Sequence, residues 1–239
     1  MAWFFGYIIF IGLVLGAGYL IVARTMGQPV AKRNIGYALP WMLVGLAIAL
    51  IPTLVTLGGP TIWNSFYLTY VILTGLWLIS WPLRKRKAGG LLLNAGRTWH
   101  NKCLFWIGLV EVVVAAIITW ISWVSLTDFP NASNTVVHTS LKIAFWWMLA
   151  ILIVSLGLNR LELRENGLCF LYNFIPWQRM KSYAWETNYP NTLTIRLQPR
   201  MVFLPGIMSI RVPEAQRDRI DQILKDCISF SPPDSLALS

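Results

Sequence analysis

Residues 104–125, which read LFWIGLVEVVVAAIITWISWVS, decide the fold of this chain. The stretch slightly exceeds the roughly 20 residues that a helix needs to cross about 30 Å of hydrocarbon. A single position in it, Glu111, carries a charge. So long an apolar run with one ionisable residue is typical of a membrane span. The stretch therefore predicts an integral membrane protein.

Four further apolar runs have the same character, and they lie at about residues 3–23, 37–57, 62–82 and 138–158. Hydrophobic residues make up 56% of the chain and charged residues only 13%, whereas about a quarter of a soluble domain is charged. The first run lacks the basic leader segment of a signal peptide, so we interpret it as a span. The fold class that follows is a multi-pass α-helical membrane protein with about five transmembrane helices in residues 1–158.

Glycine and proline predict how these runs bend and pack. Gly12 and Gly16 form a GxxxG motif, a spacing that lets two helix backbones approach closely but that also occurs by chance. Pro52 predicts a kink in the second run. Residues 58–60, Gly-Gly-Pro, predict a tight turn between the second and third runs. The segment 88–101 is too short to span, and we expect it to lie along the inner membrane surface.

The charges of the loops predict an orientation. The second loop carries no charge and the fourth carries only Asp128, whereas the first and third loops are basic. Basic loops stay in the cytoplasm, so the N-terminus is expected outside and the C-terminal tail inside, in a bacterial plasma membrane. The basic residues of the two loops are Arg24, Lys32, Arg33, Arg84, Lys85, Arg86, Lys87, Arg97 and Lys102.

Beyond residue 158 the pattern changes to the period of β-strands. Leu161 and Leu163 alternate with charged residues, as in a half-buried strand. Asn166-Gly167 is a strong hairpin signal, because both residues tolerate positive φ. Further strands are predicted in 168–175, 180–187, 192–197 and 208–212, with Pro176 interrupting the pairing.

A helix is predicted to close this sheet. Pro213 and Glu214 suit a first helical turn, and an apolar stripe at helical spacing follows them. The stripe should pack over the sheet, giving an α+β domain at 159–229 followed by a disordered tail at 230–239. The residues of the stripe are Ile220, Ile223, Leu224, Cys227 and Ile228.

Three motifs in the tail resemble those of a bacterial domain family of unknown function: ELRENGL, FIPWQRMKSYAWE and NTLTIRL, within about residues 160–229. The elements Glu165-Asn166-Gly167 and Ile175-Pro176-Trp177 carry most of the resemblance. It implies a fold of the pleckstrin-homology (PH) type, in which a curved antiparallel sheet is closed by a C-terminal helix. It also implies a membrane-attached module, and it supplies no activity and no binding residue.

Glu111 is the most unusual residue, because it lies roughly 13 Å into its run, near the bilayer centre. An ionised group there costs on the order of 3 kcal/mol, so it should face protein or water, or be protonated. One interpretation is a proton or cation relay, and the other is a protonated carboxyl that bonds a neighbouring helix. Lys142 lies too near the outer side to be its partner; better candidates are Asn64, Thr69 and Thr74.

Two basic groups are candidate surfaces. The first, Arg84, Lys85, Arg86 and Lys87, suits either attraction to anionic lipid or a stop-transfer signal. The second occupies polar strand positions in the tail and suits either a basic face toward the membrane or an acidic partner, or else a solvated face balanced by nearby acids. Its residues are Arg160, Arg164, Arg196 and Arg211.

Known catalytic signatures are missing from the sequence, which contains no HExxH, GxSxG, Walker A or GxGxxG motif. The pattern indicates no cofactor, no metal and no nucleic acid as partner. Our first hypothesis is that the helices present the PH-like domain for binding a protein or lipid headgroups at the bilayer. The alternative is a small transporter, or an accessory subunit of one, that uses Glu111.

Overall fold

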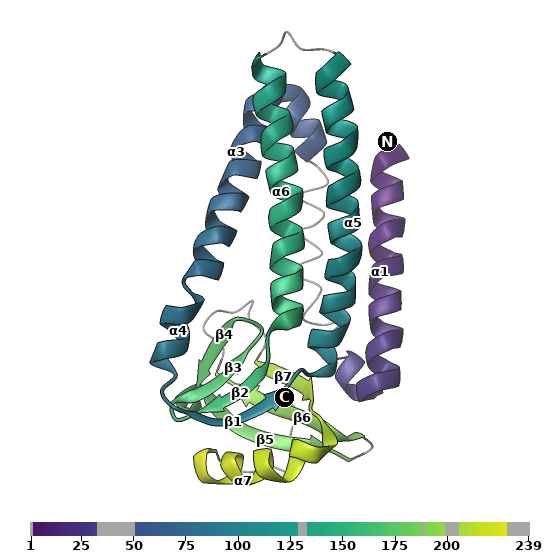
Figure 1. The fold of residues 1–239 in the computed structure, drawn as a ribbon. Helices are drawn as coiled ribbons and strands as arrows, with labels where there is room; N and C mark the ends of the chain where they lie inside the picture. The colour runs from purple at the N-terminus through teal and green to yellow at the C-terminus, as the bar shows by residue number, and fades with distance from the viewer. Residues whose placement is uncertain (1, 33–50, 129–132, 188, 199–205, 229–239) are drawn as a thin grey trace. The chain divides into compact units, whose positions relative to one another are not determined.

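The computed structural model describes residues 2–32, 51–128, 133–187, 189–198 and 206–228 (Figure 1). The chain divides into two compact units, each described by itself. The first comprises residues 1–54 with 177–239, and the second comprises residues 55–176. The C-terminal tail at residues 159–229 therefore contributes to both units.

The second unit contains the longest apolar helices. They are α3 (Ile51–Ile79), continued by the short α4 (Trp81–Lys87), then α5 (Trp99–Asp128) and α6 (Ser133–Leu158). Three helical stretches in the described residues are long and apolar enough to cross a membrane: Thr61–Lys87, Trp99–Val124 and Val136–Leu158. The structure thus confirms that apolar helices suited to a membrane occupy these three regions.

The turn predicted at residues 58–60 is wrong, because α3 is helical without interruption from Ile51 to Ile79. A helix in apolar surroundings satisfies its backbone groups internally, and glycine and proline are tolerated within it for that reason. Residues 37–50 of the second run lie outside the described residues. The total of five spans therefore stays a prediction.

Helices α5 and α6 pack along a seam of small residues. Every seventh position of α5 on this face is buried, and the residues there are Asn101, Gly108, Ala115 and Ser122. From α6, Gly157 meets Phe105 so closely that an added Cβ would lie 2.5 Å from the Phe105 backbone. Small residues let membrane helices approach in this way. The Asn101 amide also donates to the Leu156 carbonyl at 2.8 Å.

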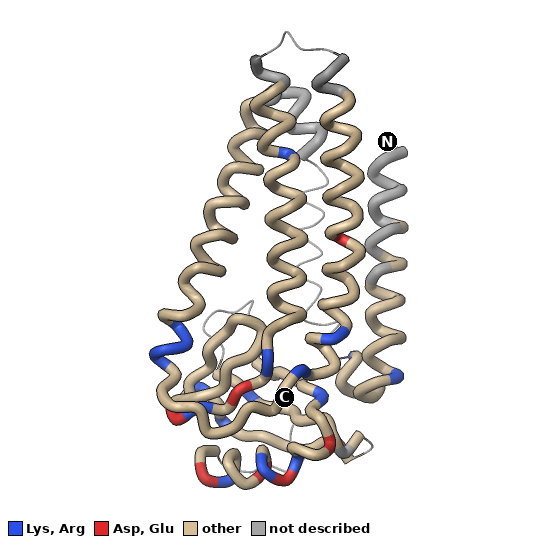
Figure 2. The backbone as a smooth tube through the Cα atoms, in the orientation of Figure 1, with Lys and Arg blue, Asp and Glu red and all other residues tan. Residues whose placement is uncertain are grey.

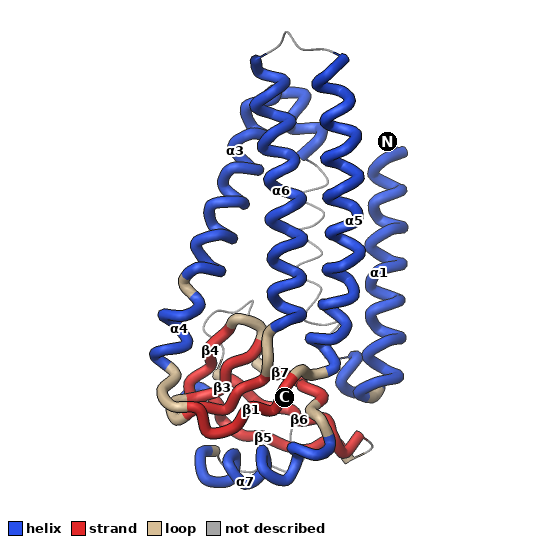
Figure 3. Tube along the Cα trace, in the orientation of Figure 1, coloured by secondary structure: helices blue, strands red, loops and turns tan. Residues whose placement is uncertain are grey.

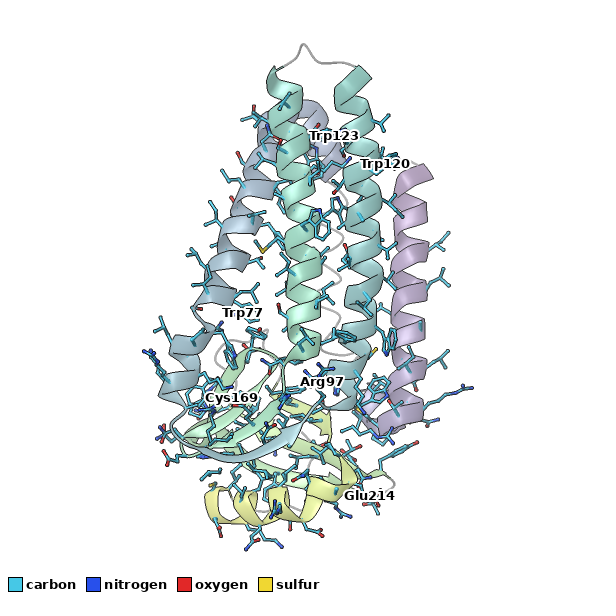
Figure 4. All side chains as sticks on the ribbon, in the orientation of Figure 1. Trp77, Arg97, Trp120, Trp123, Cys169 and Glu214 are labelled. Carbon is cyan, nitrogen blue, oxygen red and sulfur yellow. The ribbon has the colours of Figure 1, made fainter. Side chains whose placement is uncertain are left out.

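The opposite face of α5 carries large apolar side chains that the described residues of its own unit leave exposed. Trp106 and Trp120 are 68% and 71% exposed, and Val110, Val113 and Ile117 lie on the same stripe. A stripe of this kind suits contact with lipid hydrocarbon. Trp120 and Trp123, labelled in Figure 4, also line a shallow apolar groove with Ala116, Thr119 and Trp147.

The sheet of the second unit is antiparallel with the order β1-β2-β3-β4. Its strands are β1 (Leu91–Gly96), β2 (Leu161–Arg164), β3 (Gly167–Phe170) and β4 (Asn173–Pro176). The predicted hairpin between β2 and β3 is present, with Glu165 and Asn166 as its two turn residues and Gly167 paired with Arg164. Strand β1 comes from the segment 88–101, for which the sequence predicts no strand. Figure 3 shows it between α4 and α5, so the sheet takes one strand from among the membrane helices.

The first unit joins helix α1 (Ala2–Met26) to the sheet β5-β6-β7 and helix α7. The strands are β5 (Met180–Glu186), β6 (Tyr189–Leu197) and β7 (Ile207–Arg211), and α7 spans Arg217–Cys227. Ile220 and Leu224 of the predicted stripe are fully buried, whereas Cys227 is exposed. Asp221 of α7 accepts hydrogen bonds from Tyr183 and Trp185 of β5, at 3.1 and 2.8 Å. The predicted packing of the helix on a sheet is therefore present.

Two side chains of this sheet bind the end of α1. Tyr189 donates from its hydroxyl to the Ala23 carbonyl at 3.3 Å, and Arg211 donates to the Thr25 carbonyl at 3.1 Å. The last carbonyls of a helix lack internal partners and carry partial negative charge, so a guanidinium is a favourable partner. Gly27, at φ 103°, lies against the Tyr189 ring, where an added Cβ would be 2.7 Å away. The first helix is thus attached to the sheet of its own unit.

Candidate functional site

Helix α4 divides the predicted basic cluster between two faces. Hydrogen bonds from Ser80 to Leu76 and from Arg84 to Ser80 continue the helical pattern from α3 into α4. Arg84 and Lys85 are half-buried, whereas Arg86 and Lys87 are exposed. Figure 2 shows basic residues gathered on α4, directly after a helix that is otherwise nearly free of charge. The four residues therefore do not form one uniform surface.

Arg84 lies among aromatic rings and backbone carbonyls. Its guanidinium carbon is 4.8 Å from the centre of the Trp77 ring and 5.5 Å from that of Trp81. Its nitrogens donate to the Tyr172 carbonyl, at 2.9 Å, and to the Trp77 carbonyl. Cation–π contacts and hydrogen bonds together hold this arginine in place. The contacts join the end of the membrane helix to the turn between β3 and β4.

That turn has an unusual backbone. Leu171 and Tyr172 have φ angles of 48° and 59°, in the left-handed region that non-glycine residues seldom adopt. Each costs roughly 1–2 kcal/mol. The Tyr172 ring lies 5.6 Å from the Trp77 ring and 5.1 Å from the Trp81 ring, centre to centre. The ring contacts of Tyr172 with α3 and α4 therefore offset the conformational free energy that the two left-handed residues cost.

Lys85 reaches a carboxylate of the sheet. Its Nζ is 2.7 Å from Glu162 Oε1, while Arg164 donates to Glu162 Oε2 at 2.9 and 3.0 Å. Arg164 also donates to the Gly89 carbonyl at 2.8 Å. Burial raises the pKa of Glu162, but the hydrogen bonds and charges of Lys85 and Arg164 outweigh it, so the net pKa is below its ordinary value. Glu162 is therefore an ionised carboxylate held between two cations.

The hairpin turn between β2 and β3 receives the end of α4. The backbone N–H of Asn166 donates to the Ala88 carbonyl at 3.0 Å, and its side chain donates to the Lys87 carbonyl at 3.1 Å. Glu165 accepts from the Gly90 N–H at 2.8 Å. An added Cβ at Gly90 would lie 2.7 Å from the Glu165 carboxylate, so a larger residue there would displace the end of the Glu165 side chain. Carbonyls at the end of α4 thus find partners in the tail.

We call this set of contacts the helix-end clamp: Glu162, Arg164, Glu165, Asn166 and Tyr172 of the tail, with Arg84, Lys85 and residues 87–90. Sequence reasoning singled out Glu165-Asn166-Gly167 as a motif and Asn166-Gly167 as a hairpin signal, but it predicted no contact between these residues and a helix. It overlooked Glu162 and Tyr172 as contact residues. One signal was available for Glu162, since a glutamate between two leucines of a half-buried strand pairs naturally with a basic loop.

The four arginines of the predicted tail face have different surroundings. Arg160 is exposed, and Arg164 belongs to the helix-end clamp. Arg196 is half-buried on β6, and Arg211 binds the end of α1. Arg160 and Arg164 belong to the second unit, and the other two belong to the first. Arg164 and Arg211 are therefore engaged in structural hydrogen bonds.

Glu111 lies on the seam side of α5, between Gly108 and Ala115 and not on the lipid-facing stripe. Its Oε1 atom is buried and has no hydrogen-bond partner among the residues that the structure describes. The Tyr70 hydroxyl of α3 is also buried, beside Thr74, and it is close enough to the Glu111 carboxyl to interact with it electrostatically. Of the predicted partners, Asn64 bonds His138 instead, at 2.8 Å. One oxygen of the carboxyl is therefore covered by protein, with hydrogen-bonding capacity that no described residue uses.

Titratable side chains elsewhere form no evident reaction centre. Among the residues that the structure describes, no group of three or more His, Cys, Asp or Glu is placed to hold a metal ion. Burial raises the pKa of Cys169, which is marked in Figure 4, and that of Cys227, so both thiols are less readily ionised than usual. Thiolates are the reactive form of cysteine.

The comparisons with known proteins concern the tail. Residues 159–229 match the model of a domain of unknown function, DUF5673. This range holds every tail residue of the helix-end clamp, whereas β1 and the residues of α4 lie outside it. No curated protein matches the chain, and no solved structure does.

Proposed function

We propose that this is a bacterial plasma-membrane protein of five spans that holds a PH-like domain against the cytoplasmic face of the bilayer. The domain binds lipid headgroups or a neighbouring membrane protein there. The loop charges support this orientation, since the basic end of α4 and the tail share one side. The antiparallel hairpins followed by α7 support the PH-like description.

The observation that carries the proposal is the helix-end clamp. A domain on a flexible linker would need no contacts with the apolar helices of its own chain. Here Lys85 and Arg84 bond β2 and the β3–β4 turn, and strand β1 completes the sheet. In the first unit, Arg211 and Tyr189 bind the end of α1. Holding a domain at the bilayer raises its effective concentration toward partners in the same membrane.

Hydrogen exchange on the full chain in lipid nanodiscs tests this function. The expected result is that exchange in residues 159–229 slows when anionic lipid replaces neutral lipid, or when a membrane partner found by photo-crosslinking from Lys181 is added. Lys181 is exposed on β5 and suits a crosslinker. Exchange that responds neither to lipid composition nor to any crosslinked membrane protein would overturn the proposal.

A second function rests on Glu111. Its partnerless buried oxygen and the nearby Tyr70 hydroxyl suit the binding of a proton or small cation, as a transporter or an accessory subunit of one would require. Proton flux into vesicles containing the full chain is the test. Glu111→Gln should abolish flux that Glu214→Gln, an exposed control, leaves intact. Equal flux in the two variants would leave Glu111 a structural role.

A further inference from the structure

One stripe of exposed side chains runs along α3 and α4, and it changes from apolar to basic at its end. Ile72, Leu76, Ile79 and Leu83 follow at helical spacing, and they are 49%, 60%, 77% and 61% exposed. The next positions on the same stripe are Arg86 and Lys87, both exposed. The helical hydrogen bonds through Ser80 keep the stripe continuous. A surface facing lipid thus ends in two cations.

The distances along the helix match a bilayer boundary. From Ile79 to Lys87 the rise is about 12 Å, which is comparable to the depth of the headgroup region at one side of a bilayer. Leu83 is one turn before Arg86, so an acyl chain beside Leu83 places its headgroup near the two cations. Exposed large apolar side chains beside exposed cations are the usual composition of a membrane-surface contact.

Two exposed leucines follow the cations closely in sequence, at the start of strand β1. Leu91 and Leu92 are 52% and 49% exposed, although they belong to a paired strand. The register shift between Leu91 and Leu93 leaves Leu92 unpaired. Leu91 and Leu92 come only four and five residues after Lys87. Apolar side chains here suit insertion beside headgroups.

The remaining cations of the cluster are excluded from this surface by their own contacts. Arg84 is held by Trp77, Trp81 and the Tyr172 carbonyl, and Lys85 is paired with Glu162. We infer that Arg86 and Lys87, flanked by Leu83, Leu91 and Leu92, form a binding surface for the headgroup of an anionic phospholipid of the cytoplasmic leaflet. The inference rests on the proposed function, which places the end of α4 on the cytoplasmic side of the membrane.

Native mass spectrometry of the full chain in neutral detergent tests this surface, with phosphatidylglycerol and phosphatidylcholine titrated in parallel. Each basic residue near a membrane surface contributes about a factor of five, so Arg86→Gln/Lys87→Gln should weaken phosphatidylglycerol binding about 30-fold. Binding of phosphatidylcholine should not change. The matched control is Lys181→Gln/Arg219→Gln, which removes two exposed cations from other elements and should keep the preference.

Two results would overturn the inference. The first is a preference for phosphatidylglycerol that survives in Arg86→Gln/Lys87→Gln while the variant melts like the wild type. The second is displacement of the lipid by millimolar inorganic phosphate, which would identify a site for small anions. Either result leaves the hydrogen-exchange test of residues 159–229 unaffected, so failure of this surface is distinguishable from failure of the proposed function.

Discussion

Lys85, in the last turn of α4, lies 2.7 Å from the carboxylate of Glu162 in β2, the first strand of the tail. The two residues are 77 positions apart in sequence. Their side chains are 34% and 11% exposed, so water only partly screens the pair. The contact gives a carboxylate partner in the sheet to Lys85, for which the sequence suggested either attraction to anionic lipid or a stop-transfer signal.

Glu162→Gln should destabilise the second unit. The substitution removes the charge that Lys85 and Arg164 share and leaves two half-buried cations with weaker partners. We expect a loss of roughly 2 kcal/mol, the range for hydrogen bonds to charged groups. Thermal unfolding of the full chain in detergent measures it. Glu214→Gln, the same change at an exposed position, should shift the midpoint little, and equal shifts would count against a structural role for Glu162.

The clamp should also make stability depend on pH. The pKa of Glu162 is lower in the folded chain than its ordinary value of 4.5. The unfolded chain therefore binds more protons as the pH falls, so the contribution of Glu162 is complete above pH 4.5 and is lost as the pH drops through the folded pKa. The unfolding midpoint should fall in that window. In Glu162→Gln the dependence should be flatter, and an unchanged slope would exclude Glu162 as its source.

Gly157→Ala should disturb the packing of α5 and α6. The new Cβ would lie 2.5 Å from the backbone of Phe105, and backbone cannot give way as a flexible side chain can. Overpacking of this kind costs about 1–3 kcal/mol, visible as a lower unfolding midpoint. Gly16→Ala is the matched control, because nothing lies within 4 Å of the corresponding position on α1. If both variants melt alike, the seam is not a close contact.

Reporter fusions test the orientation. Fusions after residues 90 and 239 should report the cytoplasm, and a fusion after residue 130 should report the outside, because the loops at 84–102 are basic and the loop near Asp128 is not. An outside signal at residue 239 would contradict both the orientation and the proposed function.

Local pattern accounts for the parts of the fold that the sequence predicted. Long apolar runs predicted α5 and α6 closely, because length and composition suffice to identify a helix that could span a membrane. Alternation and Asn166-Gly167 predicted the β2–β3 hairpin, and the apolar stripe predicted α7. Each of these signals depends only on neighbouring residues.

The remainder depends on contacts distant in sequence. Strand β1 contains Gly96 and Asn94 and lies between two apolar helices in sequence, so no local pattern marks it as a partner of β2. The turn at Leu171 and Tyr172 contains no glycine that would mark it in the sequence. The Tyr172 ring contacts Trp77 and Trp81, which are distant from it in sequence. Arg84 and Lys85 could not be told from Arg86 and Lys87 without knowing which face the sheet covers.

The central claim is that the tail holds the end of α4, and a double-mutant cycle between Lys85 and Glu162 tests it most directly. Unfolding free energies are measured for the wild type, Lys85→Met, Glu162→Gln and the double variant, with a control cycle that pairs Lys87→Met with Glu162→Gln. We predict a coupling of about 1 kcal/mol for Lys85 with Glu162, reduced from that of a fully buried pair by the exposure of Lys85, and additive effects for Lys87. Additivity within about 0.3 kcal/mol for the Lys85–Glu162 cycle would contradict the account.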